Sequence, residues 1–364
     1  MSISIENSII VLIIFQCFFC TLFLFNTKRG KSVSNTILGV LLLILGSQFF
    51  TIFVQEAGWF DFKNYFLPFK FLYGPTIFFY TKSIILKEFR FKKKDTIHLI
   101  PFLISILLAI EIIAIKEPYI ILIVQISMFT YLIASFQSTR IHHYVLKETQ
   151  SNFDKLSLDW LKQLLVFLIA IIIIDFIYHG SGVSIGLDDM TSVYVVQLMV
   201  ILTLVSTIVL KGLKYPELFS GITDEEISIS KNIESQKYST SNLSEEDLIL
   251  GKNKVTDALV NEKLYLNPDL SLNDLSEKVA ISSRNLSYVI NSQFKMNFAD
   301  LINTYRIKAA VKIFEESKDP KQTILEVIYE VGFNSKSSFY NSFKKVVGKT
   351  PKEFKNDLKH KIPD

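Results

Sequence analysis

The sequence predicts an all-α protein in two parts, an N-terminal bundle of about seven transmembrane helices and a C-terminal all-α domain. Composition is the first reason: 49% of the 364 residues are hydrophobic, 20% are charged, and the long apolar runs all precede Lys214. No later run approaches the roughly 20 apolar residues that cross a bilayer. The second reason is a series of helix-capping residues in the polar part. The expected organisation is a membrane domain (residues 1–214), a linker (215–241) and a C-terminal domain (242–364).

Seven apolar segments are long enough to be membrane spans. They cover residues 9–25, 36–54, 66–86, 97–115, 119–136, 161–178 and 193–213. Pro75 lies inside the third segment and predicts a kink there. Fourteen Lys and Arg residues occupy alternate loops, whereas the opposite loops hold only Lys63 and Lys116. By the positive-inside rule, the N-terminus is expected outside and the C-terminal domain in the cytoplasm, which predicts a multi-pass membrane protein.

Four ionisable residues lie within or beside the outer ends of these segments, namely Lys70, Glu111, Asp175 and His179. Ionisable groups in a bilayer are costly, so they mark candidate functional sites. One interpretation is an outward-facing pocket for a small-molecule or membrane signal. The other is that the side chains reach the membrane interface, with a Lys and an Asp forming a structural pair. The sequence leaves both interpretations open.

No catalytic, cofactor-binding or metal-binding pattern stands out, and we expect a protein that is not an enzyme. Cys17 and Cys20 form a CxxC pattern, but both lie in the first apolar segment, where small buried hydrophobic residues are the better interpretation. His142 and His143 are neighbours on an expected basic loop. Zinc hydrolases instead place two His residues on one face of a helix.

The polar part contains a first helix-turn-helix pattern, in which two short helices are joined by a tight turn. Ser271 caps the first helix and Ser282 caps the second. The inward face of the second helix is expected to hold Leu286, Ile290 and Phe294, because these residues recur at helical spacing. A lone pattern of this kind is weak, since many helical hairpins share it.

The same pattern recurs after a long helical run at residues 298–316. Thr323 caps one helix, Gly332 makes the turn and Ser335 caps the next helix. The residues expected on its inward face are Phe339, Phe343 and Val346. The run between the two units is a rod of roughly 30 Å, and successive major grooves on one face of B-DNA are about 34 Å apart. One chain can therefore present two reading heads to adjacent grooves.

Three stretches of the polar part carry a resemblance to a known family. They are residues 274–279 (DLSEKV), 303–310 (NTYRIKAA) and 324–335 (ILEVIYEVGFNS). Residues 271–354 resemble the DNA-binding domain of the AraC/XylS family of bacterial transcription activators, and the order of parts resembles a subgroup with seven N-terminal spans. The resemblance implies double-stranded promoter DNA and RNA polymerase as partners, and a place in the bacterial cytoplasmic (inner) membrane. Ala280 and Ile328 depart from the family pattern, which often has Gly or another turn-forming residue at the first position and usually Ala at the second.

The DNA-reading positions follow from the inward faces and the resemblance together. Base contacts are expected from Arg284, Asn285, Ser287, Tyr288 and Asn291 in the first unit, and from Lys336, Ser337, Tyr340 and Asn341 in the second. Phosphate contacts are expected from Ser283, Ser338, Lys344 and Lys345. For Ser287 and Asn291 an ordinary exposed polar residue is an equal alternative. Arg306 is expected to be structural, pairing with acids or carbonyl groups.

The combined expectation is a one-component regulator. The bundle would sense an external or membrane signal, the C-terminal domain would bind promoter DNA, and two chains would form a homodimer. A rival interpretation is a membrane transport or interaction protein with an accessory DNA-binding domain. A third keeps DNA binding and makes the bundle a passive anchor.

Overall fold

The computed structural model describes residues 5–27, 32–60, 66–109, 117–180, 190–214, 222–223, 226–227, 243–317 and 322–361. Within these residues the chain is all helical and forms no β-strand. It divides into two compact units. The N-terminal unit comprises Met1–Arg140 and Leu158–Gly221, and the C-terminal unit comprises Ile141–Ser157 and Ile222–Asp364.

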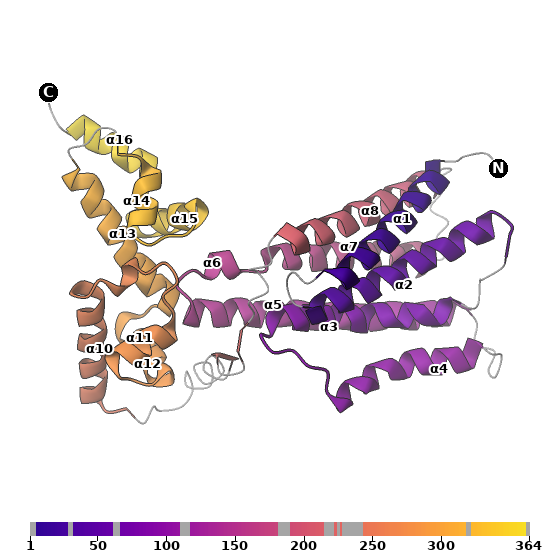
Figure 1. Cartoon of the computed structure of the whole chain (residues 1–364), viewed down its shortest axis with the longest axis horizontal. Helices are drawn as coiled ribbons and strands as arrows, with labels where there is room; N and C mark the ends of the chain where they lie inside the picture. Colours follow the sequence, from indigo (N-terminus) through magenta and orange to yellow (C-terminus); the bar gives the residue numbers. More distant parts are fainter. Residues whose placement is uncertain are drawn as a thin grey trace. The chain divides into compact units, whose positions relative to one another are not determined.

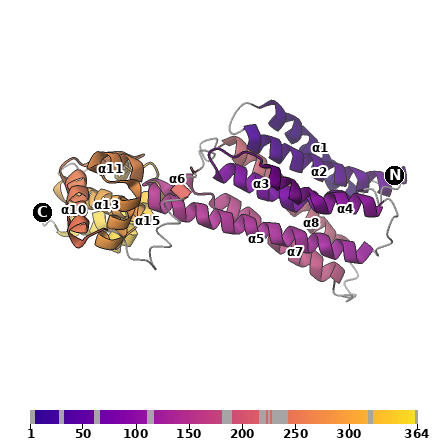
Figure 2. The ribbon, with the colours of Figure 1, turned by 90° about the horizontal axis from the view of Figure 1, so that it is seen from below.

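The N-terminal unit is built from apolar helices (Figures 1 and 2). They are α1 (Ile5–Asn26), α2 (Ser32–Glu56), α3 (Tyr73–Ile85), α4 (Ile100–Ala109), α5 (Glu117–Thr149, shared with the C-terminal unit), α7 (Asp159–Gly180) and α8 (Met190–Lys214). Each of the seven predicted segments overlaps one of these helices. Three of the described helices are long and apolar enough to cross a membrane: Ile5–Asn26, Ser32–Glu56 and Tyr119–Thr149. The count of seven spans therefore stays a prediction.

The third predicted segment is not one continuous helix. Residues Leu67–Leu72 form a 3₁₀ helix, η1, and α3 begins only at Tyr73. Pro75 consequently lies in the first turn of α3. In that turn the missing N–H of proline removes no hydrogen bond, so the residue helps to begin a helix. The chain changes from 3₁₀ to α helix at Tyr73, two residues before Pro75, and the predicted kink stays a prediction.

Helix α5 runs further than the fifth predicted segment. It continues without a break from Glu117 to Thr149, and His142 and His143 lie in it, where a loop was expected. Residues 137–149 contain no Gly or Pro, and Val145 and Leu146 are buried, so packing favours continued helix there. The chain passes from the N-terminal unit to the C-terminal unit within this helix, after Arg140.

The C-terminal unit consists of short helices that begin at capping residues. They are α10 (Glu245–Val260), α11 (Leu272–Val279), α12 (Ser283–Val289), α13 (Phe298–Glu316), α14 (Ile324–Glu330), α15 (Lys336–Val347) and α16 (Pro351–Lys361), with the short helix α6 (Phe153–Leu156) from the earlier segment. The predicted caps are confirmed: the side chains of Ser271, Ser282, Thr323 and Ser335 each accept a hydrogen bond from a backbone N–H in the first turn.

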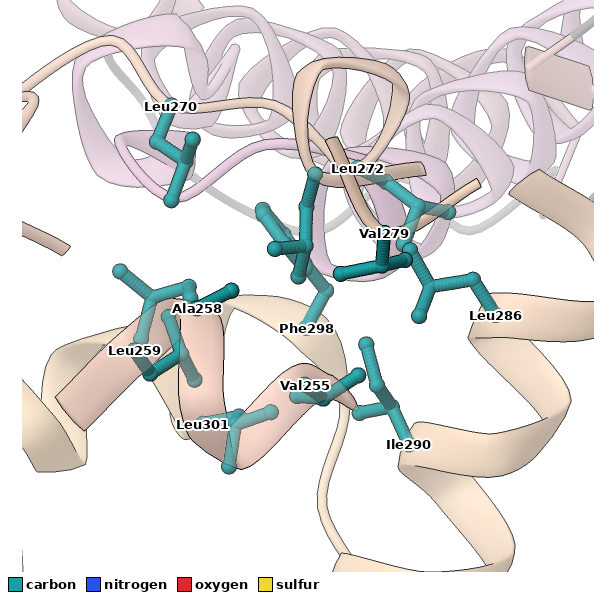
Figure 3. Close-up of a cluster of buried hydrophobic side chains, with 12 residues drawn as sticks. Val255, Ala258, Leu259, Leu270, Leu272, Val279, Leu286, Ile290, Phe298 and Leu301 are labelled. Atoms are coloured by element: carbon teal, nitrogen blue, oxygen red, sulfur yellow. The ribbon is translucent and has the colours of Figure 1, made fainter. Parts of the chain in front are cut away.

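Two hydrophobic cores hold the C-terminal helices together, and α13 contributes to both. The first core, shown in Figure 3, packs α10, α11 and α12 against the N-terminal half of α13, where Phe298, Leu301 and Ile302 are buried. The second core packs α14 and α15 against the C-terminal half of α13. The two helix-turn-helix units are therefore attached to opposite halves of one rod, as the sequence predicts.

The inward faces differ from the prediction at one position. Phe339 and Phe343 are fully buried, but Val346 is 40% exposed, and its neighbour Val347 packs against the second core. The interval from Phe343 to Val347 is four residues, and that from Phe343 to Val346 is three. Both are compatible with one helix face, so periodicity alone does not choose between them.

Candidate nucleic-acid interface

Helix α12 is the second helix of the first unit and has one face free of the core. Leu286, Val289 and Ile290 form its buried face. Arg284 is exposed, and the other predicted reading residues Asn285, Tyr288 and Asn291 are half-buried. Ser287 is only 1% exposed. Arg284 is thus freely available to solvent, whereas Ser287 is covered.

Helix α15 has the corresponding position in the second unit. Lys336, Ser337 and Asn341 are exposed on it, and Tyr340 is half-buried. The Lys336 ammonium lies 5.5 Å from the centre of the Tyr340 ring, a cation–π contact that orders the lysine near the start of the helix. Ser338 is 7% exposed. Each predicted reading helix therefore combines an exposed basic residue with one serine that is covered.

The predicted phosphate-contacting residues have different surroundings. Ser283 donates to Asn273 Oδ1 at 2.6 Å, and its hydroxyl lies 2.9 Å from that of Ser276, so it links α12 to α11. Lys345 forms an ion pair with Asp300 of α13 at 2.8 Å. Lys344 is exposed near the C-terminal end of α15. Of this set, Lys344 has the environment that best suits a phosphate contact.

The linking helix α13 has 19 residues, which corresponds to a rod of about 28 Å. That length is close to the separation of successive major grooves, about 34 Å. A hollow of about 720 Å³ lies beside the reading helices. Its lining lies wholly in the C-terminal unit and comes from both helix-turn-helix units, from α13 and from the end of α5. It includes Glu148, Asn291, Lys295, Asp300, Ser342 and Lys345. The hollow is therefore bordered by α15, by α13 and by the residues that follow α12.

Arg306 on α13 is a structural residue, as its sequence context suggests. It is 1% exposed and donates to the backbone carbonyl oxygens of Tyr265 and Asn267, each at 2.7 Å. Burial lowers the pKa of its guanidinium to about 10, and the nearby Asp269 carboxylate opposes this shift. The side chain stays cationic at neutral pH. Arg306 thereby attaches the turn before α11 (residues 265–270) to the middle of α13.

The N-terminal unit contains a separate, mostly apolar cavity of about 300 Å³. Helices α2, α3, α5, α7 and α8 line it, and its polar lining residues are Gln48, Lys70, Tyr73, Tyr80, Gln125 and Gln197. The Tyr80 hydroxyl is buried and has no hydrogen-bond partner among the described residues. Of the four predicted pocket residues, Lys70 lines this cavity. Glu111 lies outside the described residues, as do the side chains of Asp175 and His179 in α7.

Comparisons with known proteins agree on the C-terminal part of the chain. A family model described as a helix-turn-helix domain matches residues 275–357. An uncharacterized HTH-type transcriptional regulator of Staphylococcus aureus (strain MSSA476) is 30% identical over 138 residues, which are 38% of this chain and 18% of that protein. The Msm operon regulatory protein of Streptococcus mutans is 26% identical over 113 residues, which are 30% of this chain and 40% of that protein.

A solved structure is also similar in part. The C-terminal domain of AraT, a response regulator from Geobacillus stearothermophilus, matches with 23% identity and a TM-score of 0.26, over 32% of this chain and 88% of the solved one. That score is too low to establish a common fold. The chain spans less than half the length of the two curated relatives above. The family match and the two capped units show that the C-terminal part of this chain is a helix-turn-helix DNA-binding domain of the AraC type.

Proposed function

We propose that this protein is a membrane-bound transcription regulator that recognises promoter DNA through both helix-turn-helix units. The observation that carries the proposal is the pair of reading helices, α12 and α15, attached to the two halves of one rod of about 28 Å. A helical hairpin that only packs in a core has no need for a second copy at this spacing. Two reading helices on one chain, joined by a rod whose length is close to the spacing of successive major grooves, suit recognition of a DNA site with two parts.

The proposed base contacts begin with the exposed basic residue on each reading helix. Arg284 can donate two parallel hydrogen bonds to a guanine, and Asn285 and Asn341 can bond an adenine in the same bidentate way. Lys336 supplies a donor at the start of α15. Lys344 contributes a phosphate contact that sets register without reading sequence. Ser337, Tyr288 and Tyr340 complete the faces that enter the grooves.

A membrane location is supported by the apolar surface of the N-terminal helices. Phe15 is 68% exposed, Leu22 64% and Ile126 58%, each on a helix long enough to cross a bilayer. Large apolar side chains exposed along a whole helix suit lipid as the surrounding solvent. We propose seven spans in the bacterial inner membrane, with the N-terminus outside and the C-terminal unit in the cytoplasm, because the loop charges favour that orientation.

The sensing function is proposed for the cavity among α2, α3, α5, α7 and α8. An apolar lining with a few convergent polar groups is typical of small-molecule sites. Lys70 provides a positive charge, and the buried Tyr80 hydroxyl provides a hydrogen-bonding group that needs a partner. The ligand that suits these groups is a largely apolar molecule with one anionic or polar end. A passive anchor would have no use for such a lining.

The test of DNA recognition is genome-wide occupancy of the intact protein by crosslinking and sequencing. We expect discrete promoter sites with two half-sites about one helical turn apart. Arg284→Ala should relax preference at one base pair and weaken binding by about 1–3 kcal/mol. Lys252→Ala, at an exposed position on α10, is the matched control and should leave the sites unchanged. Absence of any discrete site would overturn the proposal.

The same occupancy assay tests the remaining partners and the signal. Recovery of RNA polymerase with the bound promoters, and of differently tagged copies together, would support contact with polymerase and a homodimer. Tyr80→Phe and Lys70→Gln should alter how occupancy responds to growth conditions while leaving the half-site sequence unchanged. Equal responses in both variants and the unaltered protein would favour the passive anchor. Substrate flux into vesicles would favour the transport alternative.

A further inference from the structure

A segment that precedes the sixth predicted span belongs to the DNA-binding part of the molecule. Residues 141–157, here called the arm, comprise the end of α5, the short helix α6 and the turn between them. The arm clusters with residues 222–364 as one compact unit. Several of its polar side chains are almost fully covered: Glu148 is 5% exposed, Thr149 2% and Ser151 1%. Such burial of polar groups in a connecting segment indicates a specific docking contact.

The two carboxylates of the arm bind one residue on each reading head. Glu148 Oε2 accepts a hydrogen bond from the side-chain amide of Asn291, directly after α12, at 3.0 Å. Asp154 Oδ2 accepts from the Ser338 hydroxyl, at the start of α15, at 2.6 Å. Hydrogen bonds to ionised acceptors are stronger than neutral ones. The arm therefore connects both heads through charged groups.

Three further hydrogen bonds fix the middle of the arm between these two points. Ser151 donates its backbone N–H to the carbonyl of Leu270 at 3.2 Å, and its hydroxyl accepts from Arg306 at 3.2 Å. Asn152 donates to Asp269 at 2.8 Å. These bonds place the arm against the turn that leads into α11. The arm thus contacts the first head, the rod and the second head in succession.

The docked arm and a DNA duplex would share two contact residues, Asn291 and Ser338, while Arg284, Lys336 and Lys344 stay exposed. Asn291 and Ser338 are positions where DNA contact is expected, and both are bound to carboxylates of the arm. Ser287, another expected reading residue, is 1% exposed although it lies off the main core face of α12. A reading helix must enter a groove about 12 Å wide, and phosphates line the edges of that groove. Carboxylates at this surface would repel them, and partly buried charges are weakly screened by salt.

We propose that the arm is an intramolecular competitor of DNA: it occupies the surface between the reading heads, and promoter DNA binds when it leaves. The proposal rests on the proposed DNA-binding function. It also gives the N-terminal unit a covalent route to the interface, since the arm continues α5 without a break. A ligand that favours one conformation of the bundle can then change the fraction of chains whose arm is docked.

The experiment measures promoter binding by the full chain reconstituted in lipid nanodiscs. The duplex is the one recovered by occupancy mapping, or a random-sequence duplex pool where none is recovered. The test variant is the double substitution Glu148→Ala and Asp154→Ala. We expect it to bind about tenfold tighter than the unaltered chain, because two hydrogen bonds to charged acceptors no longer hold the arm in place. The matched control is Glu245→Gln with Glu246→Gln, which removes two exposed acids of the same unit away from the arm.

A second measurement guards against a variant that merely misfolds. Cysteines placed by Asn152→Cys and Asp269→Cys, at two side chains that lie 2.8 Å apart and outside the expected DNA contacts, can be joined by a bis-maleimide that a reductant cleaves, with Cys17 and Cys20 replaced by Ala. We expect the joined protein to lose promoter binding and to recover it on cleavage, so that each sample is its own control.

The outcomes separate the two proposals. Equal affinity of the unaltered chain, the arm variant and the control, or undiminished binding after joining, would overturn the arm proposal and leave DNA binding intact. An equal gain in the arm variant and the control would also overturn it, since general charge would then be the cause. Binding of no duplex by any of these proteins would overturn the proposed function and the arm proposal with it.

Discussion

Gly332 occupies a position where a side chain would meet backbone from another part of the domain. Its φ of +89° lies in the left-handed region. A Cβ atom there would lie 2.7 Å from the carbonyl oxygen of Leu266 and 2.8 Å from that of Tyr265. Both distances are well below van der Waals contact, and the opposing atoms are backbone. Gly332→Ala should therefore disturb the packing of the second unit against the turn before α11.

The magnitude has two parts that a control can separate. A left-handed backbone costs an Ala about 1–2 kcal/mol, and overpacking against fixed backbone costs about 1–3 kcal/mol more. Gly348 has a similar φ of +84°, but a Cβ there would have no neighbour within 4 Å. Gly348→Ala should thus lose the conformational part alone. Effects on the unfolded chain are similar for both and cancel in the difference.

The assay is urea unfolding of a soluble fragment, residues 242–364, followed by circular dichroism. The fragment contains both hydrophobic cores, and we expect a single cooperative transition for the unaltered sequence. Gly332→Ala should lower the free energy of unfolding by about 2–5 kcal/mol and Gly348→Ala by about 1–2 kcal/mol, with similar slopes. Equal losses in the two variants would refute the close approach of Gly332 to the turn.

Three further predictions use the same fragment. Ala280 has a φ of +51°, so Ala280→Gly should raise the free energy of unfolding by about 0.5 kcal/mol, and a loss would contradict the left-handed assignment. Arg306→Met removes the donor to the carbonyl oxygens of Tyr265 and Asn267 and should lower the free energy of unfolding by about 2–4 kcal/mol. An unchanged free energy of unfolding would mean that the buried guanidinium does not stabilise the domain. Hydrogen bonds from Thr323 lower the pKa of Glu326 below 4.5, so its contribution to stability is present above pH 4.5 and is lost as pH falls through the lowered value. Glu326→Gln should flatten that acid-side dependence in unfolding curves.

The helix starts of the C-terminal domain could be predicted because the signals are local. A capping hydroxyl and the N–H that it accepts from lie three residues apart, so Ser271 and Thr323 identify helix starts from sequence alone. Gly332 is similar, since its turn needs a positive φ. Neighbouring residues do not determine which valine, Val346 or Val347, packs against the second core. That choice depends on where α16 and α13 approach the end of α15.

The extent of α5 and the docking of the arm could not be predicted in the same way. The bonds that hold the arm join residues more than 100 positions apart, such as Glu148 to Asn291, and involve polar side chains that follow no period. Hydropathy locates where a membrane segment becomes polar, but it does not indicate whether the helix ends there. The available signal was the run from 137 to 149, which lacks Gly and Pro and so contains no helix breaker.

The turn before α11 connects the arm to the spacing of the two heads. Asp269 Oδ1 accepts hydrogen bonds from Asn152 of the arm at 2.8 Å and from Asn334, just before α15, at 3.1 Å. Departure of the arm would remove the first bond and leave the second. The Arg306 bonds to the same turn also join residues outside the arm. These contacts would still join the two heads when the arm leaves, whereas the bonds from Glu148 to Asn291 and from Asp154 to Ser338 would be lost. Release of the arm would uncover an interface that is already arranged for DNA, so the arm would regulate by covering the heads rather than by reshaping them.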